Sequence, residues 1–513
     1  MINVKNQNNV LLFVTYFRAE FFNKIIFKTK NMKLITMKIQ IYLFTIFATL
    51  TLNAQQKQTR FEIKNQMISG SDEYKISESY FMGQEFEKTE CLTQIQRFSL
   101  NQEMESNRQK ILQKNPNAFK QLKKLTLFQN PFRAKAGFNG YGFHTLNNQV
   151  DQNLTPNNKL LDYYCGTRTY DWINGNHQGT DYILWPYPWK NMDENTMEII
   201  SASPGIIIVK KDGFSDKNCV NNGNPNWNGI VVQHSDGSTA IYMHFKKNGI
   251  TSKVVGDAVD AGEFLGLAGS SGSSNTPHLH FEVRDSQNNV IDPYAGACNS
   301  MNTESWWANQ ENYYVPKINR ISTHSSSQYN TPCPQPENTY EKVNFNAGDM
   351  LYLRIYLRDI QTGDLIQFSL KDPNNNVVSS WNWNSPWPFY ATAWAFWSME
   401  ITTSWQTGIY TMSAKYYDQI YETQFAVGTQ MSTAETNMAN IYIYPNPADE
   451  ILNLKLDNPA EKYTIFAMDG RKIDEQKINS LKTEINIQKL AAGTYILAIQ
   501  SQGVTRKVKF IKK

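Results

Sequence analysis

Apolar and polar residues alternate along much of this chain in short runs separated by turn residues, which is the pattern of β-strands. Between about residues 129 and 300 the runs are divided by Gly, Asn, Asp and Pro. Residues 316–430 repeat this texture with many tryptophans, and the segment from residue 441 onward is again rich in β-type runs. We therefore predict a mainly β fold built from antiparallel sheets.

The pattern of apolar and polar residues changes along the chain, which predicts several folded units. The length of 513 residues suggests the same. Residues 55–128 contain helix-like patches, notably NRQKILQKNPNAFKQLKKL, and are expected to form a short helical N-terminal region or a pro-segment. We expect an antiparallel β-sheet domain at residues 129–315 and a β-sandwich domain at residues 316–430. A polar linker, residues 431–440, then leads to a C-terminal β domain at residues 441–513.

The N-terminal part of the chain contains a pattern typical of a secretory signal peptide. After Met37 a lysine precedes an apolar run from Ile41 to Leu52, followed by Asn-Ala-Gln, which predicts a signal peptide at residues 37–54. The apolar run is shorter than the ~20 residues that a membrane span needs. Because a signal peptide begins a chain, we expect residues 1–36 to precede the true start of translation.

Charge and cysteine usage narrow the classes of partner and site. The net charge of +4 is small, and no basic stretch is interleaved with aromatic residues, so we expect no nucleic-acid partner. We also expect a monomer. The cysteines include no C-x-x-C pair, which argues against a structural zinc cluster. Disulfides would fit export, but the odd number leaves at least one thiol unpaired and the pairing open. The five cysteines are Cys91, Cys165, Cys219, Cys298 and Cys333.

One short stretch, HLHFEV at residues 278–283, alternates histidine and glutamate with apolar residues. Successive side chains of a strand point to opposite faces, so His278, His280 and Glu282 share one face while the apolar residues share the other. One face is therefore suited to packing and the other to chemistry. No H-E-x-x-H motif is present, so we expect Glu282 to support a ligand or to lie at the surface.

Two other patterns add further candidate ligands. NHQGTDY places His177 and Asp181 four residues apart, at a turn that enters a strand, which alone is a weak signal. VVQHSDGSTAIYMHF predicts a hairpin around Asp-Gly, with His234 before the turn and His244 at its end. We expect His234 to be structural. Combined with HLHFEV, the patterns supply three ligands and the open fourth position of a catalytic zinc ion.

The motifs HQGTD, YMH and HLHFEV, in this order and with G-D-x-V-x-x-G-x-x-L-G before the last, resemble the lysostaphin and LytM type of zinc endopeptidase. The resemblance implies an antiparallel β fold with a narrow groove and one Zn²⁺ per chain on its floor. Carried over by position, it assigns zinc binding to His177, Asp181 and His280. It assigns catalysis to His244 and His278, whose individual roles stay open.

The resemblance implies hydrolysis of peptide bonds, with the cross-bridges or stem peptides of bacterial peptidoglycan as the expected substrate. Glycine-rich proteins are the alternative substrate, and a cell-wall-binding module without activity is the alternative to an enzyme. All five family positions are filled, which favours activity. Two histidines and a carboxylate also describe the facial triad of iron oxygenases. The second pair of histidines favours hydrolysis, because oxygen activation does not need it.

Aromatic residues follow the first two candidate ligands. They are candidates to line the groove and hold an extended peptide, with interior packing as the equal alternative. These residues are Tyr182, Trp185, Tyr187 and Trp189. The tryptophans of the predicted sandwich favour core contacts over a glycan-binding platform. They are Trp381, Trp383, Trp387, Trp394 and Trp397.

The C-terminal segment resembles the type A sorting domain of type IX secretion, through YPNPA and the GTY of LAAGTYILAI. The resemblance implies a bacterium with an outer membrane, the type IX secretion machinery as a partner, and a secreted or cell-surface protein exported through the periplasm. If the active site of a peptidase is blocked until export, the enzyme cannot cleave substrates inside the producing cell. Asn and Asp side chains in residues 147–158 are candidates for a fourth metal ligand, and the alternative is an upstream segment packed elsewhere.

Overall fold

The computed structural model describes most of the chain beyond the expected signal peptide. The described residues are 57–62, 66–70, 74–85, 91–120, 126–153, 159–172, 175–220, 224–329, 333–385, 388–429, 441–456, 460–467, 471–501 and 504–513. The predictions for residues 1–36, 37–54 and 431–440 therefore fall outside them. The described chain is mainly β with almost entirely antiparallel pairing, as predicted. No helix within these ranges is long and apolar enough to cross a membrane.

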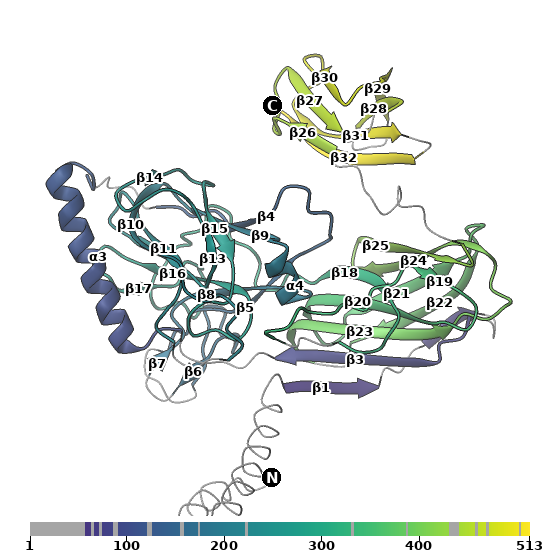
Figure 1. Cartoon of the computed structure of the whole chain (residues 1–513), viewed down its shortest axis with the longest axis horizontal. Helices are drawn as coiled ribbons and strands as arrows, with labels where there is room; N and C mark the ends of the chain where they lie inside the picture. The colour runs from purple at the N-terminus through teal and green to yellow at the C-terminus, as the bar shows by residue number, and fades with distance from the viewer. Residues whose placement is uncertain are drawn as a thin grey trace, which may run out of the picture. The chain divides into compact units, whose positions relative to one another are not determined.

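Two sheets form the region of residues 126–315, called here the two-sheet region (Figure 1). The larger sheet has the order β14-β10-β11-β12-β16-β8-β5, with β17 beside β16, and the smaller has the order β13-β15-β9-β4. The larger sheet comprises β5 (His144–Asn148), β8 (Thr180–Leu184), β10 (Gly205–Lys211), β11 (Gly229–Gln233), β12 (Thr239–Met243), β14 (Ala258–Val259), β16 (His278–Arg284) and β17 (Val290–Ile291). The smaller comprises β4 (Phe132–Ala134), β9 (Met197–Ile200), β13 (Phe245–Ile250) and β15 (Phe264–Ala268). The short strands β6 (Asp171–Trp172) and β7 (Gly175–Asn176) pair with each other, and α4 (Pro188–Asp193) follows β8.

Alternation along the strands sorts side chains between the two faces of the larger sheet. Leu279 and Phe281 of β16 are buried in the core that the two sheets share. Because side chains alternate, His278 and His280 lie on the other face. Met243 of β12 belongs to a second apolar cluster, which also contains residues of the helix α3 (Gln94–Lys114).

The helix α3 lies along this second face (Figure 1). Its start is fixed by a capping box, in which the Thr93 hydroxyl accepts a bond from the Gln96 amide at 3.2 Å and the Gln96 side chain accepts one from the Thr93 amide at 2.8 Å. Leu100, Met104 and Ile111 are its buried residues. The helix ends before Pro116, since the residue preceding a proline disfavours helical conformation. The helical pattern expected around residues 107–125 is therefore confirmed only in its first part.

Two further sheets form a β-sandwich, with the orders β1-β3-β23-β20-β18 and β19-β25-β24-β21-β22-β2. The first sheet comprises β1 (Lys57–Glu62), β3 (Glu78–Glu85), β18 (Lys317–His324), β20 (Met350–Ile360) and β23 (Tyr390–Glu400). The second comprises β2 (Gln66–Gly70), β19 (Asn344–Phe345), β21 (Leu365–Lys371), β22 (Val377–Asn384), β24 (Gly408–Tyr416) and β25 (Gln419–Val427).

The structure divides the segment that was expected to form one N-terminal region. β2 pairs with β22 and β3 pairs with β23, so the first strands complete the sandwich sheets. Residues 91–114 instead pack on the two-sheet region. The physical reason is that backbone N–H and C=O groups along β22 and β23 gain hydrogen-bond partners from these strands.

The tryptophans of the sandwich are interior residues, as expected. Trp381, Trp383 and Trp397 are buried in its main core, and Trp394 is buried in a cluster that includes Trp185 of the two-sheet region. Trp387 lies outside the described residues.

The C-terminal domain contains two small sheets around its own apolar core. One has the order β26-β27-β30 and the other β29-β28-β31-β32. The strands are β26 (Ile441–Tyr444), β27 (Ile451–Leu456), β28 (Lys462–Ala467), β29 (Lys472–Lys477), β30 (Lys482–Asn486), β31 (Gly493–Ser501) and β32 (Val504–Lys512).

Four of the five cysteines form two disulfides, which the sequence left unassigned. Cys165 bonds to Cys298, and Cys219 bonds to Cys333. Cys91 remains a free, buried thiol. The odd cysteine is therefore located just before α3.

Candidate metal centre

Strand pairing brings the expected ligands together. β16 pairs with β8, and their register sets His280 opposite Asp181. His177 lies just before β8, directly after β7. Side chains opposite each other in an antiparallel pair lie close enough to touch, so the motifs HQGTD and HLHFEV meet at one place.

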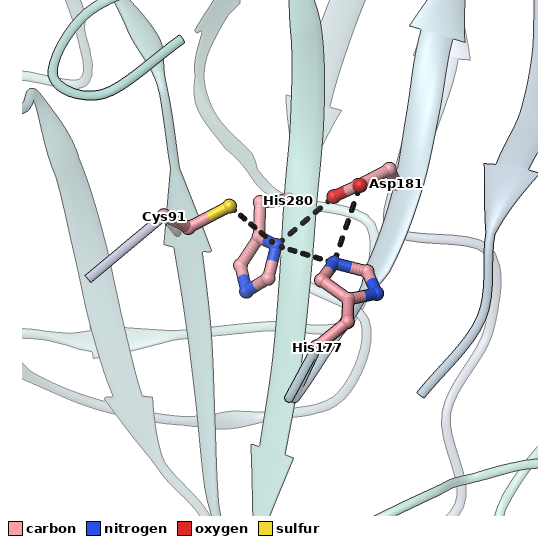
Figure 2. A group of neighbouring side chains, drawn as sticks. All are labelled: Cys91, His177, Asp181 and His280. Atoms are coloured by element: carbon pink, nitrogen blue, oxygen red, sulfur yellow. Dashed lines mark hydrogen bonds and ion pairs between the residues drawn. The ribbon is translucent and has the colours of Figure 1, made fainter. Parts of the chain in front are cut away.

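The three side chains aim their ligand atoms at one another (Figure 2). His280 Nδ1 lies 3.0 Å from Asp181 Oδ1 and 3.3 Å from His177 Nε2. His177 Nε2 lies 3.2 Å from Asp181 Oδ2. The three side chains are buried, with exposed fractions of 1% for His177, 4% for Asp181 and 0% for His280.

These separations fit a metal ion bound by all three residues. Tetrahedral zinc with bonds of about 2.0–2.1 Å to nitrogen and oxygen places neighbouring ligand atoms ~3.3 Å apart. His177 Nδ1 donates to the carbonyl oxygen of Gln149 at 2.7 Å, which leaves the lone pair of a neutral ring on Nε2. A cation between imidazole lone pairs and a carboxylate would stabilise their convergence in this buried place. A donor set of two histidines and one carboxylate occurs in catalytic zinc sites.

Electrostatics at the centre favour positive charge. Burial acts to lower the pKa of His177, but the Asp181 carboxylate outweighs burial and raises that pKa to about 9. Burial acts to raise the pKa of Asp181, but the charge of His177 holds it well below its usual value. The same attraction would hold a divalent cation.

Neighbouring groups orient the ligands. Asn148 donates from Nδ2 to Asp181 Oδ2 at 3.0 Å. Glu282 is fully buried, and its Oε2 lies 3.5 Å from His280 Nε2. Arg97 of α3 holds both oxygens of Glu282 at 2.9 Å. Its burial is at odds with a surface position, and it lies beside the ring of the expected ligand His280.

Gly179, between the first two ligands, allows the His280 ring to approach the backbone. A Cβ atom at this position would lie 2.6 Å from Cε1 and Nε2 of His280 and 2.9 Å from the carbonyl oxygen of Phe281. The glycine in HQGTD is therefore needed for space.

We predict that Gly179→Ala weakens zinc binding by about 10–100-fold, the usual effect of disturbing the groups that orient a ligand. The added methyl group would push the His280 ring out of its position. Competition with a chelator of known affinity measures the change, and thermal unfolding of the zinc-free protein is the control for general damage. Unchanged zinc affinity would show that the ring has room to move.

The two expected catalytic histidines lie beside the ligands. His244 follows β12, and its Nδ1 donates to the Ser271 carbonyl oxygen at 2.6 Å. His278 Nδ1 donates to the Thr276 carbonyl oxygen at 2.7 Å. The ring centroids of His244 and His278 are 4.4 Å apart. These bonds leave Nε2 of each neutral ring as the atom that accepts a proton.

The aromatic residues proposed to line a groove are interior in this structure. Tyr182 and Trp189 are buried in the core between the two sheets. Trp185 and Tyr187 are buried against the sandwich, where Trp185 Nε1 donates to the Leu357 carbonyl oxygen at 3.0 Å. All four therefore follow the packing alternative, since burying large rings contributes more than exposing them. His234 is also structural, as expected: it is buried, and its Nδ1 donates to the Pro204 carbonyl oxygen.

One residue at the centre was not predicted from the sequence. Cys91 is buried, and its Sγ lies 3.6 Å from His280 Nδ1 (Figure 2). The same sulfur atom lies 3.4 Å from the Tyr170 hydroxyl oxygen. Burial acts to raise the pKa of this thiol, but the charge of His280 lowers it well below its usual value. The odd number of cysteines was the available signal, but Cys91 stands far from every motif in the sequence.

Comparisons with known proteins identify two parts of the chain. Residues 176–293 match the model of peptidase family M23, and residues 442–513 match that of the secretion system C-terminal sorting domain.

The curated relatives match a limited part of the chain. An uncharacterized metalloprotease of Buchnera aphidicola subsp. Baizongia pistaciae is 36% identical over 110 residues, which are 21% of this chain and 23% of the relative. The glycyl-glycine endopeptidase ALE-1 of Staphylococcus capitis is 32% identical over 127 residues, or 25% and 29% of the two chains. The chain thus spans about a quarter of the length of these relatives.

Among solved structures, the catalytic domain of lysostaphin from Staphylococcus simulans is 26% identical to the matched part of this chain. The match covers 24% of this chain and 78% of that domain, with a TM-score of 0.17.

Proposed function

Because residues 176–293 are a peptidase family M23 domain and residues 442–513 are a secretion sorting domain, we propose that the chain is an exported zinc endopeptidase that cleaves bacterial peptidoglycan. The substrate bonds would lie in the peptide cross-bridges or stem peptides. The observation that carries the proposal is the convergence of three ligand atoms beside two further histidines whose Nδ1 atoms are held by backbone carbonyl groups.

His177, Asp181 and His280 would hold the metal ion. A bound zinc ion is a Lewis acid that lowers the pKa of water and polarises a peptide carbonyl group. His244 and His278 would orient the attacking water, donate a hydrogen bond to the developing oxyanion and deliver a proton to the leaving amine through Nε2. Because hydrogen bonds to backbone carbonyl groups already fix the two rings, the rings need no reorganisation during the reaction.

Two observations support the proposed location and bond type of the substrate. The sorting domain implies type IX secretion, which makes the protein secreted or attached to the cell surface. One relative is named as a glycyl-glycine endopeptidase, which suggests glycine-containing peptide bonds as the target. Glycine-rich proteins remain the alternative substrate.

The test offers the zinc-loaded protein two substrates, isolated bacterial cell walls and a soluble glycine-rich protein, and identifies the new amino termini. The Cys91→Ala variant is assayed in parallel, because Cys91 and α3 cover the metal centre. We expect new termini from the walls, at bonds within the peptide part. Cleavage of the soluble protein alone would move the substrate class to proteins. The absence of new termini from both substrates, with either form of the protein, would contradict a peptidase.

A further inference from the structure

The position of Cys91 points to a fourth ligand. Its sulfur atom and the ligand atoms of His177, Asp181 and His280 all lie within 4.8 Å of one another. The residue comes from the segment that precedes α3, outside the matched peptidase domain. Cys91 therefore reaches the centre from a separate part of the chain.

The distance from Cys91 to the nearest ligand agrees with a sulfur atom bound to zinc. Bonds of about 2.3 Å to sulfur and about 2.0–2.1 Å to nitrogen place the two atoms ~3.6 Å apart in a tetrahedron. The observed separation of Cys91 Sγ from His280 Nδ1 is 3.6 Å. With the three ligands described above, the sulfur atom completes a four-ligand set. Catalytic zinc sites keep this fourth position open for water or substrate, whereas a site with four protein ligands is closed.

A second observation at the same place concerns the catalytic histidines. Cys91 Sγ also lies within 4.8 Å of nitrogen atoms of His244 and His278. Nε2 of His244 is buried and makes no hydrogen bond among the described residues. In a working site this atom would bond to water or substrate. The sulfur atom thus occupies space beside the unsatisfied catalytic nitrogen.

The contacts of α3 keep Cys91 in this position. Arg97, in the first turn of α3, forms a partly buried ion pair with Glu282 at 2.9 Å. Farther along the helix, Asn107 donates to the Ile208 carbonyl oxygen at 2.9 Å and Arg108 donates to Gln233 at 2.6 Å. The helix and Cys91 also share one apolar cluster with β10, β11 and β12. Movement of this segment would expose the histidines on that face of the sheet.

Asp151, the aspartate of residues 147–158, is not among the side chains whose ligand atoms converge with that of His280. Asn148 bonds to Asp181, and the backbone of Gln149 bonds to His177, so both support ligands that are already counted. Residues 154–158 lie outside the described ranges.

We propose that Cys91 is the fourth protein ligand of the metal ion, and that the chain folded in this way is a latent form of the enzyme. Latency rests on the proposed peptidase function. The assignment of Cys91 as a metal ligand rests on the geometry alone. Release of residues 91–114 from the sheet frees the fourth position for water and opens the face that carries His244 and His278. The chain itself therefore regulates access to its metal centre.

X-ray absorption at the zinc edge of the full, zinc-loaded chain tests the ligand directly. We expect one sulfur atom at about 2.3 Å in the wild type and none in Cys91→Ala, with one zinc ion per chain in both. The wild-type measurement is valid whether or not a variant folds. Leu92→Ala is the matched control, because it alters the adjacent buried residue of the same cluster and keeps the sulfur. A wild-type spectrum without sulfur would overturn the proposal.

The cleavage assay tests latency with the same proteins. We expect Cys91→Ala to release new amino termini from cell walls at least ten times faster than the wild type. Equal rates in two active proteins, with sulfur bound in the wild type, would overturn latency and leave Cys91 as a structural ligand. If sulfur is bound and neither protein cleaves any substrate, the proposed peptidase function fails while the ligand assignment stands.

Discussion

Replacing His244 or His278 with alanine is expected to lower kcat by about 10²–10⁴-fold, the usual contribution of a positioned acid or base. Each chain should still bind one zinc ion, because neither residue belongs to the ligand set around His280 Nδ1. Metal content measured by atomic emission, for both zinc and iron, is compared with kcat on cell walls. The variants are made in whichever of the wild-type and Cys91→Ala backgrounds is more active.

The matched controls are Asp181→Ala and His280→Ala, which should lose zinc and activity together. Removing either residue takes away a ligand atom from a buried metal ion and weakens its binding in both backgrounds. His278 and His280 form a sharp comparison, since they stand on the same face of β16, two residues apart. If the His278 variant lost its zinc and the His280 variant kept it, the two roles on this strand would have to be exchanged. Bound iron in place of zinc would favour the oxygenase alternative.

Replacing Trp185 with alanine is expected to destabilise the protein by about 3–5 kcal/mol, as for other large buried aromatic residues. The side chain is fully buried, packs 5.9 Å from Tyr356 between ring centroids, and donates from Nε1 to the Leu357 carbonyl oxygen. Its loss leaves a cavity where the two-sheet region contacts β20 of the sandwich. Calorimetric unfolding of the variant and wild type measures the change.

The control for this prediction is Trp185→Phe, which keeps much of the ring and loses the hydrogen bond. It should cost about 1 kcal/mol for the bond, plus the smaller loss of packing. Neither variant should change KM for wall peptides, since Trp185 is interior. A higher KM at unchanged stability would instead indicate that Trp185 contacts the substrate, as in the groove alternative.

The candidate ligands were predicted from local sequence patterns together with a family resemblance. Alternation in HLHFEV was enough to place His278 and His280 on one face, because the period of a strand is two residues whatever its neighbours. Family resemblance then assigned His177, Asp181 and His244 to the same centre, and the register of β8 with β16 places Asp181 opposite His280. Fold class followed in the same way, since short alternating runs and turn residues are local signals.

Other features depended on contacts between distant segments. Exposure of an aromatic side chain is set by what packs on it, so the sequence left Trp185 equally suited to a groove and to the interior. Pairing of β2 and β3 with the sandwich joins strands more than 300 positions apart, which no local pattern encodes. Cys91 is the clearest case. Its sequence neighbourhood marks only the start of a helix, and it meets His280 at 3.6 Å because α3 packs its apolar residues on the face that bears the metal centre. The sequence by itself indicated the candidate metal-binding residues, because their spacing and resemblance are local properties, and only the tertiary structure decided that a distant thiol lies beside them.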